Sequence, residues 1–487
     1  MKFKAPSSRT APIPDTTNRE GFEAFARTDE AALVSAATNS RLSKNTFYES
    51  KDESLAKLEK LATQVAKTNP LFVAQLAWWV RNNDGHRTTS HVLAGIVAAT
   101  HNGAPWASKF FNKIVYRPDD MCQIMAYIWT RYPSKKGKST SNKRKKNWVP
   151  NAVKRGFRKA FARFKPETLR RYSQNQSPSL YTLANLVHPP GAPGSAPYLL
   201  RGGNLPKVRN RESVLADNSM EASEKWDEIL RDPSKVGYLM AIRNLAKVTR
   251  DAPDKLPVLL EIVSSKERLK ATPVGLHELV VASVQPDVAK NRRAYSAVMT
   301  AIDNYVELVP SVPGLVILFD CSDSMDGLPK TFGSIFAAAL MMKNADASLV
   351  AFGSSTEVPR VAWDKQTVSA AADKLASVSL GGTNFSLALS YVERTITEPN
   401  AISNIIILSD QEANRGTRSS TIIRALRARN PNMRVYCWDL AAQQASQVPS
   451  EEETLISGVS SEMFKILEKG QSDPNALIHE IEKITFD

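Results

Sequence analysis

The stretch GLVILFDCSDS at residues 314–324 decides the fold of the C-terminal part of this 487-residue chain. Its first six residues are small or apolar, and Asp320 ends the run. A short apolar run that stops at a polar residue is typical of a buried β-strand. The hydroxyl-rich segment Asp320-Cys321-Ser322-Asp323-Ser324 therefore begins where a predicted strand ends.

Three more short apolar runs follow, and helical stretches separate them. The runs cover residues 347–352, 402–408 and 433–438. Buried strands that alternate with helices are typical of a parallel sheet with helices on both faces. We therefore predict a doubly wound α/β domain over residues 311–487, with helices at 328–344, 366–377, 385–397 and 419–429.

The chain before this domain has a different character. Apolar residues recur at steps of three and four, as at Leu58, Leu61 and Val65, which predicts amphipathic helices. Pro or Gly often falls between the helical stretches, so short antiparallel helix pairs are expected, as in an α-solenoid. We predict a helical domain over residues 21–310, preceded by an extended arm at 1–20 that is rich in Pro, Thr and Arg.

The positive charge of the chain is concentrated in the helical part. The net charge is +15, although residues 311–487 hold 15 Lys and Arg against 21 Asp and Glu. Between Arg131 and Arg171 lie 16 basic residues and a single acid, Glu167. A charge so localised favours a polyanionic partner. The alternative is that runs such as Lys143-Arg144-Lys145-Lys146 form a solvated loop without a partner.

The end of the first predicted strand offers ligands for a cation. Asp320, Ser322 and Ser324 place one carboxylate and two hydroxyls at alternate positions of one loop. Thr383 follows two glycines on another loop, and Asp410 ends the third apolar run. Ligands of open α/β sheets bind at the carboxyl ends of strands, and hard oxygen donors suit Mg²⁺. The sequence thus predicts a divalent-cation site, unless the hydroxyls only cap the following helix.

These positions resemble the metal-ion-dependent adhesion site of von Willebrand factor A domains. The pattern of that family is D-x-S-x-S, then Thr, then Asp, on neighbouring loops. The matching positions all have the family's residue type, and they are Asp320, Ser322, Ser324, Thr383 and Asp410. In such domains the metal leaves one position for a partner's carboxylate or for water, so the resemblance implies binding rather than catalysis.

The basic segment predicts contacts to phosphates, which Lys and Arg supply. Phe157, Phe161 and Phe164 recur at steps of four and three, so we assign them to a buried stripe, and Trp78 and Trp79 likewise to core packing. Tyr172 is a candidate for base stacking, and His188 precedes two prolines at a predicted helix end. The candidate RNA-binding residues are Lys143, Arg144, Lys145, Lys146, Lys154, Arg155, Arg158, Lys159, Arg163, Arg170, Arg171, Tyr172 and His188.

A helical half followed by an A domain resembles the Ro autoantigen family, whose members carry a TROVE domain. Local stretches similar to that family lie at 45–48 (NTFY), 157–161 (FRKAF), 183–190 (LANLVHPP), 241–247 (AIRNLAK) and 405–416. The likeness spans about residues 20–485. In place of the family's H-x-K-P, this sequence has His188-Pro189-Pro190 and so lacks the lysine.

The resemblance implies a monomeric ring of HEAT-like helical repeats. The outer surface of such a ring binds structured Y or Y-like noncoding RNA, and its hole accepts single-stranded 3′ ends of misfolded RNA. A role in RNA quality control or processing follows, together with association with a 3′ exoribonuclease such as polynucleotide phosphorylase. A competing hypothesis from another class is an A-domain adaptor for a chaperone or ATPase machine, without an RNA role.

Several classes are disfavoured by what the sequence lacks. We find no nucleophile–histidine arrangement and no Walker-type phosphate loop, so we expect no catalysis; a metal-dependent nuclease is the weakest competitor. The odd count of three cysteines, Cys122, Cys321 and Cys437, argues against disulfides and favours a reducing compartment. No secretory signal or membrane-length apolar stretch is evident, and we expect a cytoplasmic protein without membrane contact.

Overall fold

The structure is a computed structural model of the full chain. It describes residues 12–39, 50–132, 149–173, 176–206, 209, 211–215, 217–272, 274–441, 443, 445–449, 453–457, 462–469, 473 and 475–487. These residues form two compact units, each assembled from separate stretches of the chain. The first unit combines residues 12–39 with 260–478, and the second combines 51–259 with 479–487.

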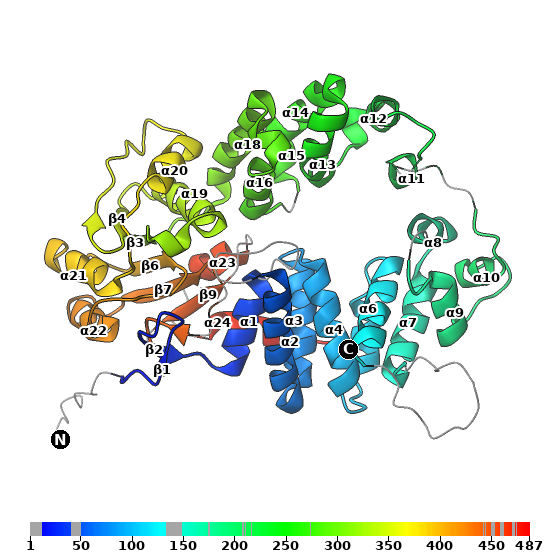
Figure 1. The fold of residues 1–487 in the computed structure, drawn as a ribbon, viewed down its shortest axis with the longest axis horizontal. Coiled ribbons are helices and arrows are strands. Elements are labelled where there is room, and N and C mark those ends of the chain that lie inside the picture. Colours follow the sequence, from blue (N-terminus) through cyan, green and yellow to red (C-terminus); the bar gives the residue numbers. More distant parts are fainter. Residues whose placement is uncertain are drawn as a thin grey trace. The chain divides into compact units, whose positions relative to one another are not determined.

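A six-stranded sheet is the centre of the first unit (Figure 1). Its strand order is β5-β4-β3-β6-β7-β9, and all neighbours are parallel except β4 and the edge strand β5. The predicted parallel α/β sheet is confirmed; β5 and β9 were not anticipated. The strands are β3 (Leu315–Asp320), β4 (Ser348–Phe352), β5 (Thr356–Glu357), β6 (Asn404–Ser409), β7 (Arg434–Asp439) and β9 (Thr454–Ser457).

Helices surround this sheet, and alternate residues of its strands serve two cores because successive side chains point to opposite faces. On one face, Val316 and Leu318 pack with Phe385. On the other, Phe319 approaches Gly333 so closely that a Cβ there would lie 2.7 Å from its ring. The helices after β3 include α19 (Leu328–Lys343), α20 (Val368–Ala376), α21 (Phe385–Thr395), α22 (Ser419–Arg429) and α23 (Glu462–Lys469). The same unit has a helical stretch before β3, which contains α15 (Lys266–Lys270), α16 (Leu276–Ser283), α17 (Pro286–Ala289) and α18 (Arg292–Tyr305).

The N-terminal segment completes the first unit rather than forming an extended arm. Strands β1 (Thr16–Thr17) and β2 (Glu23–Ala26) form a small antiparallel sheet with β8 (Ala445–Ser446). Helix α1 (Asp29–Asn39) follows and is buried along most of its length. The predicted arm at 1–20 is therefore corrected for residues 16–20, which enter this small sheet and its turn.

The second unit is helical, and within the residues that the structure describes no helix is long and apolar enough to cross a membrane. Helix α3 packs on α4, and α5 packs closely on α7. Phe157 and Phe161 of α7 are buried and Phe164 is partly buried, as their spacing of four and three residues predicted. The helices are α2 (Lys51–Thr68), α3 (Pro70–Asn82), α4 (Arg87–Thr100), α5 (Ala107–Lys113), α6 (Pro118–Arg131), α7 (Asn151–Arg163), α8 (Pro166–Tyr172), α9 (Leu180–Val187), α10 (Ala196–Arg201), α11 (Arg211–Leu215), α12 (Ala222–Leu230) and α13 (Tyr238–Asp251).

The last nine residues of the chain complete this helical unit. Phe486 joins an aromatic cluster, with its ring centroid 5.2 Å from that of Phe110 and 6.2 Å from that of Trp106. Lys113 Nζ donates to the Thr485 carbonyl at 3.0 Å. Helix α14 (Leu256–Ser264) and helix α24 (Ala476–Glu482) each contain a boundary between the units. The change from helices to sheet near residue 310 is as predicted, but the compact units divide elsewhere.

Candidate metal site and basic surface

The candidate metal site lies where two adjacent parallel strands end. Asp320 ends β3, and Ser409 and Asp410 lie at the end of β6 beside it. The Ser409 hydroxyl donates to Asp320 Oδ2 at 2.6 Å, and the Ser322 amide donates to Asp320 Oδ1 at 2.9 Å. These contacts orient the Asp320 carboxylate, and Ser409 is a supporting residue that the D-x-S-x-S pattern did not indicate.

The other predicted ligands are held by loops tied to one another. The Ser322 and Ser324 hydroxyls lie 3.1 Å apart. The Asp323 amide donates to the Gly381 carbonyl at 2.9 Å, which joins the first loop to the loop of Thr383. Thr383 in turn exchanges hydrogen bonds with Asn414, through its amide to Asn414 Oδ1 and through its carbonyl to the Asn414 amide, both at 3.1 Å. All three predicted segments thus meet at one edge of the sheet.

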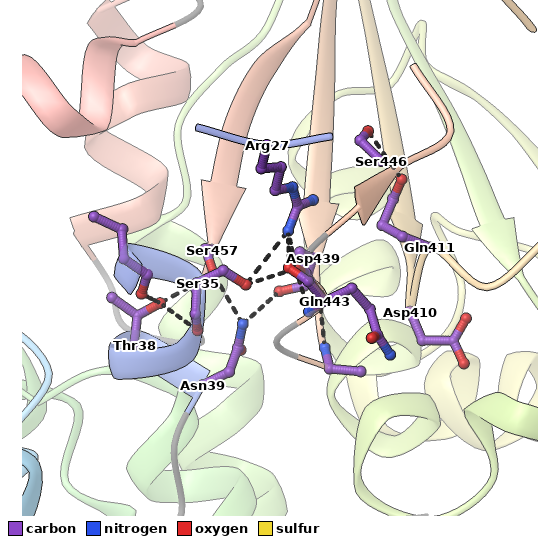
Figure 2. A network of polar contacts seen from close by, with 12 residues as sticks. Arg27, Ser35, Thr38, Asn39, Asp410, Gln411, Asp439, Gln443, Ser446 and Ser457 are labelled. Atoms are coloured by element: carbon purple, nitrogen blue, oxygen red, sulfur yellow. Dashed lines mark hydrogen bonds and ion pairs between the residues drawn. The ribbon is translucent and has the colours of Figure 1, made fainter. Parts of the chain in front are cut away.

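The electrostatics at this edge fit a divalent cation. Asp320 and Asp410 are both fully buried. Burial, together with the neighbouring charge of Asp320, raises the pKa of Asp410 to about 8. Asp410 Oδ2 has no hydrogen-bond partner among the described residues, and Figure 2 shows this carboxylate directed away from the neighbouring polar network. Two buried carboxylates with adjacent hydroxyls are a donor set that Mg²⁺ favours.

A second kind of metal site would be built from three or more carboxylates, thiolates or imidazoles. In the described ranges, no three His, Cys, Asp or Glu side chains gather as a metal-binding group. The candidate set consists of two carboxylates and three hydroxyls. Asp320, Ser322, Ser324, Thr383 and Asp410 would hold the ion, which would supply a Lewis-acid position for an oxygen ligand from outside the chain.

The basic residues predicted to bind RNA are distributed over α7 and α8 of the helical unit. Arg155, Arg158 and Lys159 are exposed, and Lys154 is partly buried. Arg158 also donates from Nε to the Val187 carbonyl at 2.9 Å, which places it beside the end of α9. Lys143, Arg144, Lys145 and Lys146 lie outside the described residues.

Two further candidates have structural partners. Arg163 Nη2 donates to the Asn112 carbonyl at 2.6 Å and to the Val115 carbonyl at 2.8 Å, so it fastens the end of α5. The Arg117 guanidinium lies 4.3 Å from the centroid of the Tyr172 ring, so one face of this stacking candidate is covered. On α8, Arg170 is partly buried and Arg171 is exposed.

His188 has the exposure that its position before two prolines suggested. It caps α9 with φ of 48°, in the left-handed region, and its side chain is exposed. Tyr181 and Asn185 lie four residues apart on α9, and both are exposed, as is His188. Tyr181 is 52% exposed, which is unusual for a large aromatic side chain.

Sequence analysis missed two exposed aromatic residues near His188, which are Tyr181 and Tyr198. Tyr198 on α10 is 47% exposed, and α10 packs on both α7 and α9. Arg201 of the same helix reaches the Pro189 carbonyl at 3.4 Å, directly after His188. We call Arg155, Arg158, Lys159, Tyr181, His188 and Tyr198 the α7–α10 surface. The spacing of Tyr181 and His188 along α9 was the signal available in the sequence.

A separate groove of about 560 Å³ lies between α2, α4 and α6 of the helical unit. Arg87, His91, Tyr127 and Arg131 contribute to its lining. Two of these lining residues belong to a buried charge cluster, in which Arg87 Nε lies 2.7 Å and His91 Nε2 lies 3.0 Å from Asp120 Oδ1. Burial alone would raise the pKa of Asp120, but the hydrogen bond to His91 and the nearby guanidinium groups hold it well below its usual range.

Comparisons with known proteins agree with this architecture. The TROVE domain model matches residues 18–200, and the model of the VWA domain of CoxE-like proteins matches residues 292–446. The crystal structure of the Deinococcus radiodurans Ro (RSR) protein is similar, with a TM-score of 0.62 at 13% sequence identity. The similarity covers 91% of this chain and 100% of that chain. No curated protein sequence matches. The chain thus contains a region that matches the TROVE domain and a later region that matches a von Willebrand factor A domain, and it has the fold of the Ro protein.

Proposed function

We propose that the protein is a Ro-type RNA-binding protein. It binds structured, Y-like noncoding RNA and the single-stranded 3′ ends of misfolded RNA, and it acts in RNA quality control or processing. The observation that carries this proposal is the α7–α10 surface, on which helices that pack on one another carry exposed cations and exposed aromatic rings within the TROVE match. Cations neutralise phosphates, and aromatic rings stack on unpaired bases.

Salt dependence tests the phosphate contacts. Each phosphate contact contributes about 0.7–0.9 to the slope of log affinity against log salt. Replacing both Arg155 and Lys159 with Ala should therefore reduce the slope by roughly 1.4–1.8 for a structured RNA with a single-stranded 3′ tail, measured by filter binding. The matched control is the exposed pair Arg360→Ala and Lys365→Ala in the A domain, which should leave the slope unchanged.

Two results would contradict the proposal. Affinity that does not depend on salt, or no binding to any RNA with a 3′ tail, would exclude binding through phosphate contacts. Equal slopes for the α7–α10 variant and for the control would place the RNA elsewhere. The segment 143–146 is tested in the same way, since changing its four basic residues together to Ala should lower the slope by a few units.

The A domain provides the second part of the proposed function. Its buried Asp320 and Asp410 support a Mg²⁺ site that accepts an oxygen ligand from a protein partner, with a 3′ exoribonuclease such as polynucleotide phosphorylase as the partner we propose. Calorimetric titration with Mg²⁺ tests the site, and Asp410→Asn should abolish the binding heat. Binding that survives this substitution would place the metal elsewhere.

The protein is proposed to lack catalysis of its own and to act in the cytoplasm. Labelled RNA incubated with the protein and Mg²⁺ should remain intact; cleavage that Asp320→Ala abolishes would identify a nuclease instead. An adaptor for an ATPase machine would purify without nucleic acid. The ratio of absorbance at 260 and 280 nm, followed by sequencing of co-purified RNA, distinguishes that function from RNA binding.

A further inference from the structure

The loop that presents Asp410 has a strained backbone. Gln411, the next residue, has φ of 62°, in the left-handed region that a residue with a side chain rarely adopts. Such strain persists only where surrounding contacts determine the conformation. Gln411 is fully buried, and its Oε1 accepts from the Gln447 amide at 3.3 Å and from the Ser446 hydroxyl at 3.4 Å.

The N-terminal segment holds the other side of this loop. Asn18 Nδ2 donates to the Ala413 carbonyl at 2.5 Å, and the Arg19 amide donates to Glu412 Oε2 at 3.0 Å. Asn18 is 9% exposed, and Glu412 is 2% exposed. Both contacts join residues that are almost 400 positions apart in the sequence, and both lie within the first unit.

A tight turn at residues 18–22 positions the Asn18 and Arg19 donors that bind the loop after Asp410. Asn18 Oδ1 accepts from the Phe22 amide at 2.9 Å, and the Asn18 amide donates to the Phe22 carbonyl at 2.9 Å. Phe22 packs against the core cluster that contains Ala413. Asn18 therefore uses its carbonyl oxygen to shape the turn and its amide nitrogen to bind the loop after Asp410.

The contacts on the far side of the loop also depend on the N-terminal segment. Ser446, which reaches Gln411, belongs to strand β8, and β8 pairs with β2 at Phe25 and Ala26. Figure 2 shows Ser446 and Gln411 joined beside Asp410, whose carboxylate has no partner drawn. The loop between Asp410 and Ala413 is thus held on one side by residues 18–22 and on the other by a strand that β2 supports.

We infer that residues 18–22 position the metal site, with Asn18 as the central positioning residue. They hold the loop in the strained conformation that leaves Asp410 Oδ2 available to a cation. This inference rests on the proposed Mg²⁺ site. Because coupling between two binding events is reciprocal, Mg²⁺ bound at Asp410 also stabilises the docked N-terminal segment.

The test is metal affinity of the full chain, measured by calorimetric titration with Mg²⁺. Asn18→Ala removes both side-chain hydrogen bonds, and we expect the dissociation constant to rise roughly tenfold. Ser35→Ala is the matched control: it lies in the same segment and loses a buried hydrogen bond of 2.7 Å to Asp439, but it does not contact residues 410–413. Its dissociation constant should equal that of the unmodified protein.

The outcomes separate the inference from the proposed function. If the unmodified protein binds no Mg²⁺, the proposed metal site fails. If it binds Mg²⁺ and the two variants have the same affinity as each other, the positioning role of Asn18 is overturned. If Asn18→Ala does not fold, hydrogen exchange of the unmodified protein tests the inference instead. Saturating Mg²⁺ should slow exchange at the Arg19 and Phe22 amides. Unchanged exchange at these amides overturns the inference.

Discussion

The buried ion pair between Arg27 and Asp439 allows a quantitative test of how the N-terminal segment is attached. Arg27 Nη1 lies 2.5 Å from Asp439 Oδ2, and the two side chains are 1% and 0% exposed. Figure 2 shows this pair at the centre of a network that joins α1 to β7 and β9. Arg27→Met removes the guanidinium and leaves the carboxylate buried.

The magnitude follows from what remains around Asp439. Removal of one partner from a buried ion pair costs about 3–5 kcal/mol. Asp439 keeps three donors: the Ser35 hydroxyl at 2.7 Å, the Ala441 amide at 2.9 Å and the Gln443 amide at 3.0 Å. These contacts still stabilise the carboxylate, so we expect the low end of the range, about 3 kcal/mol.

Native-state hydrogen exchange of the β7 peptide, Arg434–Asp439, measures the effect within the first unit. A loss of about 3 kcal/mol should accelerate the slowest amides by on the order of a hundredfold. Arg418→Met is the control, because its exposed pair with Glu23, at 3.5 Å, also joins the N-terminal segment to this unit. An exposed pair contributes only about 0–1 kcal/mol. Equal exchange rates for the two variants would refute the reasoning.

Three further predictions concern the helical unit. Tyr181→Ala should weaken binding of RNA with unpaired bases by about 1–3 kcal/mol in filter binding and leave the salt slope unchanged; an altered slope would rule out stacking as its role. Burial lowers the pKa of His91 below its ordinary 6.5, so stability should fall as the pH drops from 7.5 to 5, and melting curves of His91→Gln should show a smaller fall. Gly156→Ala should cost about 1–3 kcal/mol in urea unfolding, because its Cβ would lie 2.4 Å from Phe111 Cβ; Gly237→Ala, which meets nothing within 4 Å, should cost less.

The central sheet was predictable because its signals are local. Each parallel strand between Leu315 and Asp439 is a short apolar run, and each run is followed by a helical period. The candidate metal ligands Asp320, Ser322 and Ser324 could be chosen for the same reason, since they lie within five residues directly after a predicted strand, and Asp410 likewise follows one. Edge strand β5 has only two residues and carries no such pattern.

The role of the N-terminal segment could not be predicted from local patterns. Asn18 and Arg27 find partners only after about 400 intervening residues have folded. A polar residue in a Pro- and Thr-rich segment is normally solvated, and its burial depends on tertiary contacts that periodicity does not report. Arg163 illustrates the same limit: its sequence neighbours suggest a phosphate contact, but carbonyls at the end of α5 engage its guanidinium.

Each unit combines stretches that lie far apart in the sequence, and this determines when each unit can be completed during synthesis. Residues 12–39 are synthesised well before their partner sheet, because strand β3, which begins that sheet, follows about 275 residues later. At about 5–20 residues per second, the segment waits for tens of seconds with its apolar face uncovered. The helical unit waits longer still, because Phe486 follows its partner Phe110 by about 375 residues. The nascent chain is therefore a natural client for chaperones that cover exposed apolar surface.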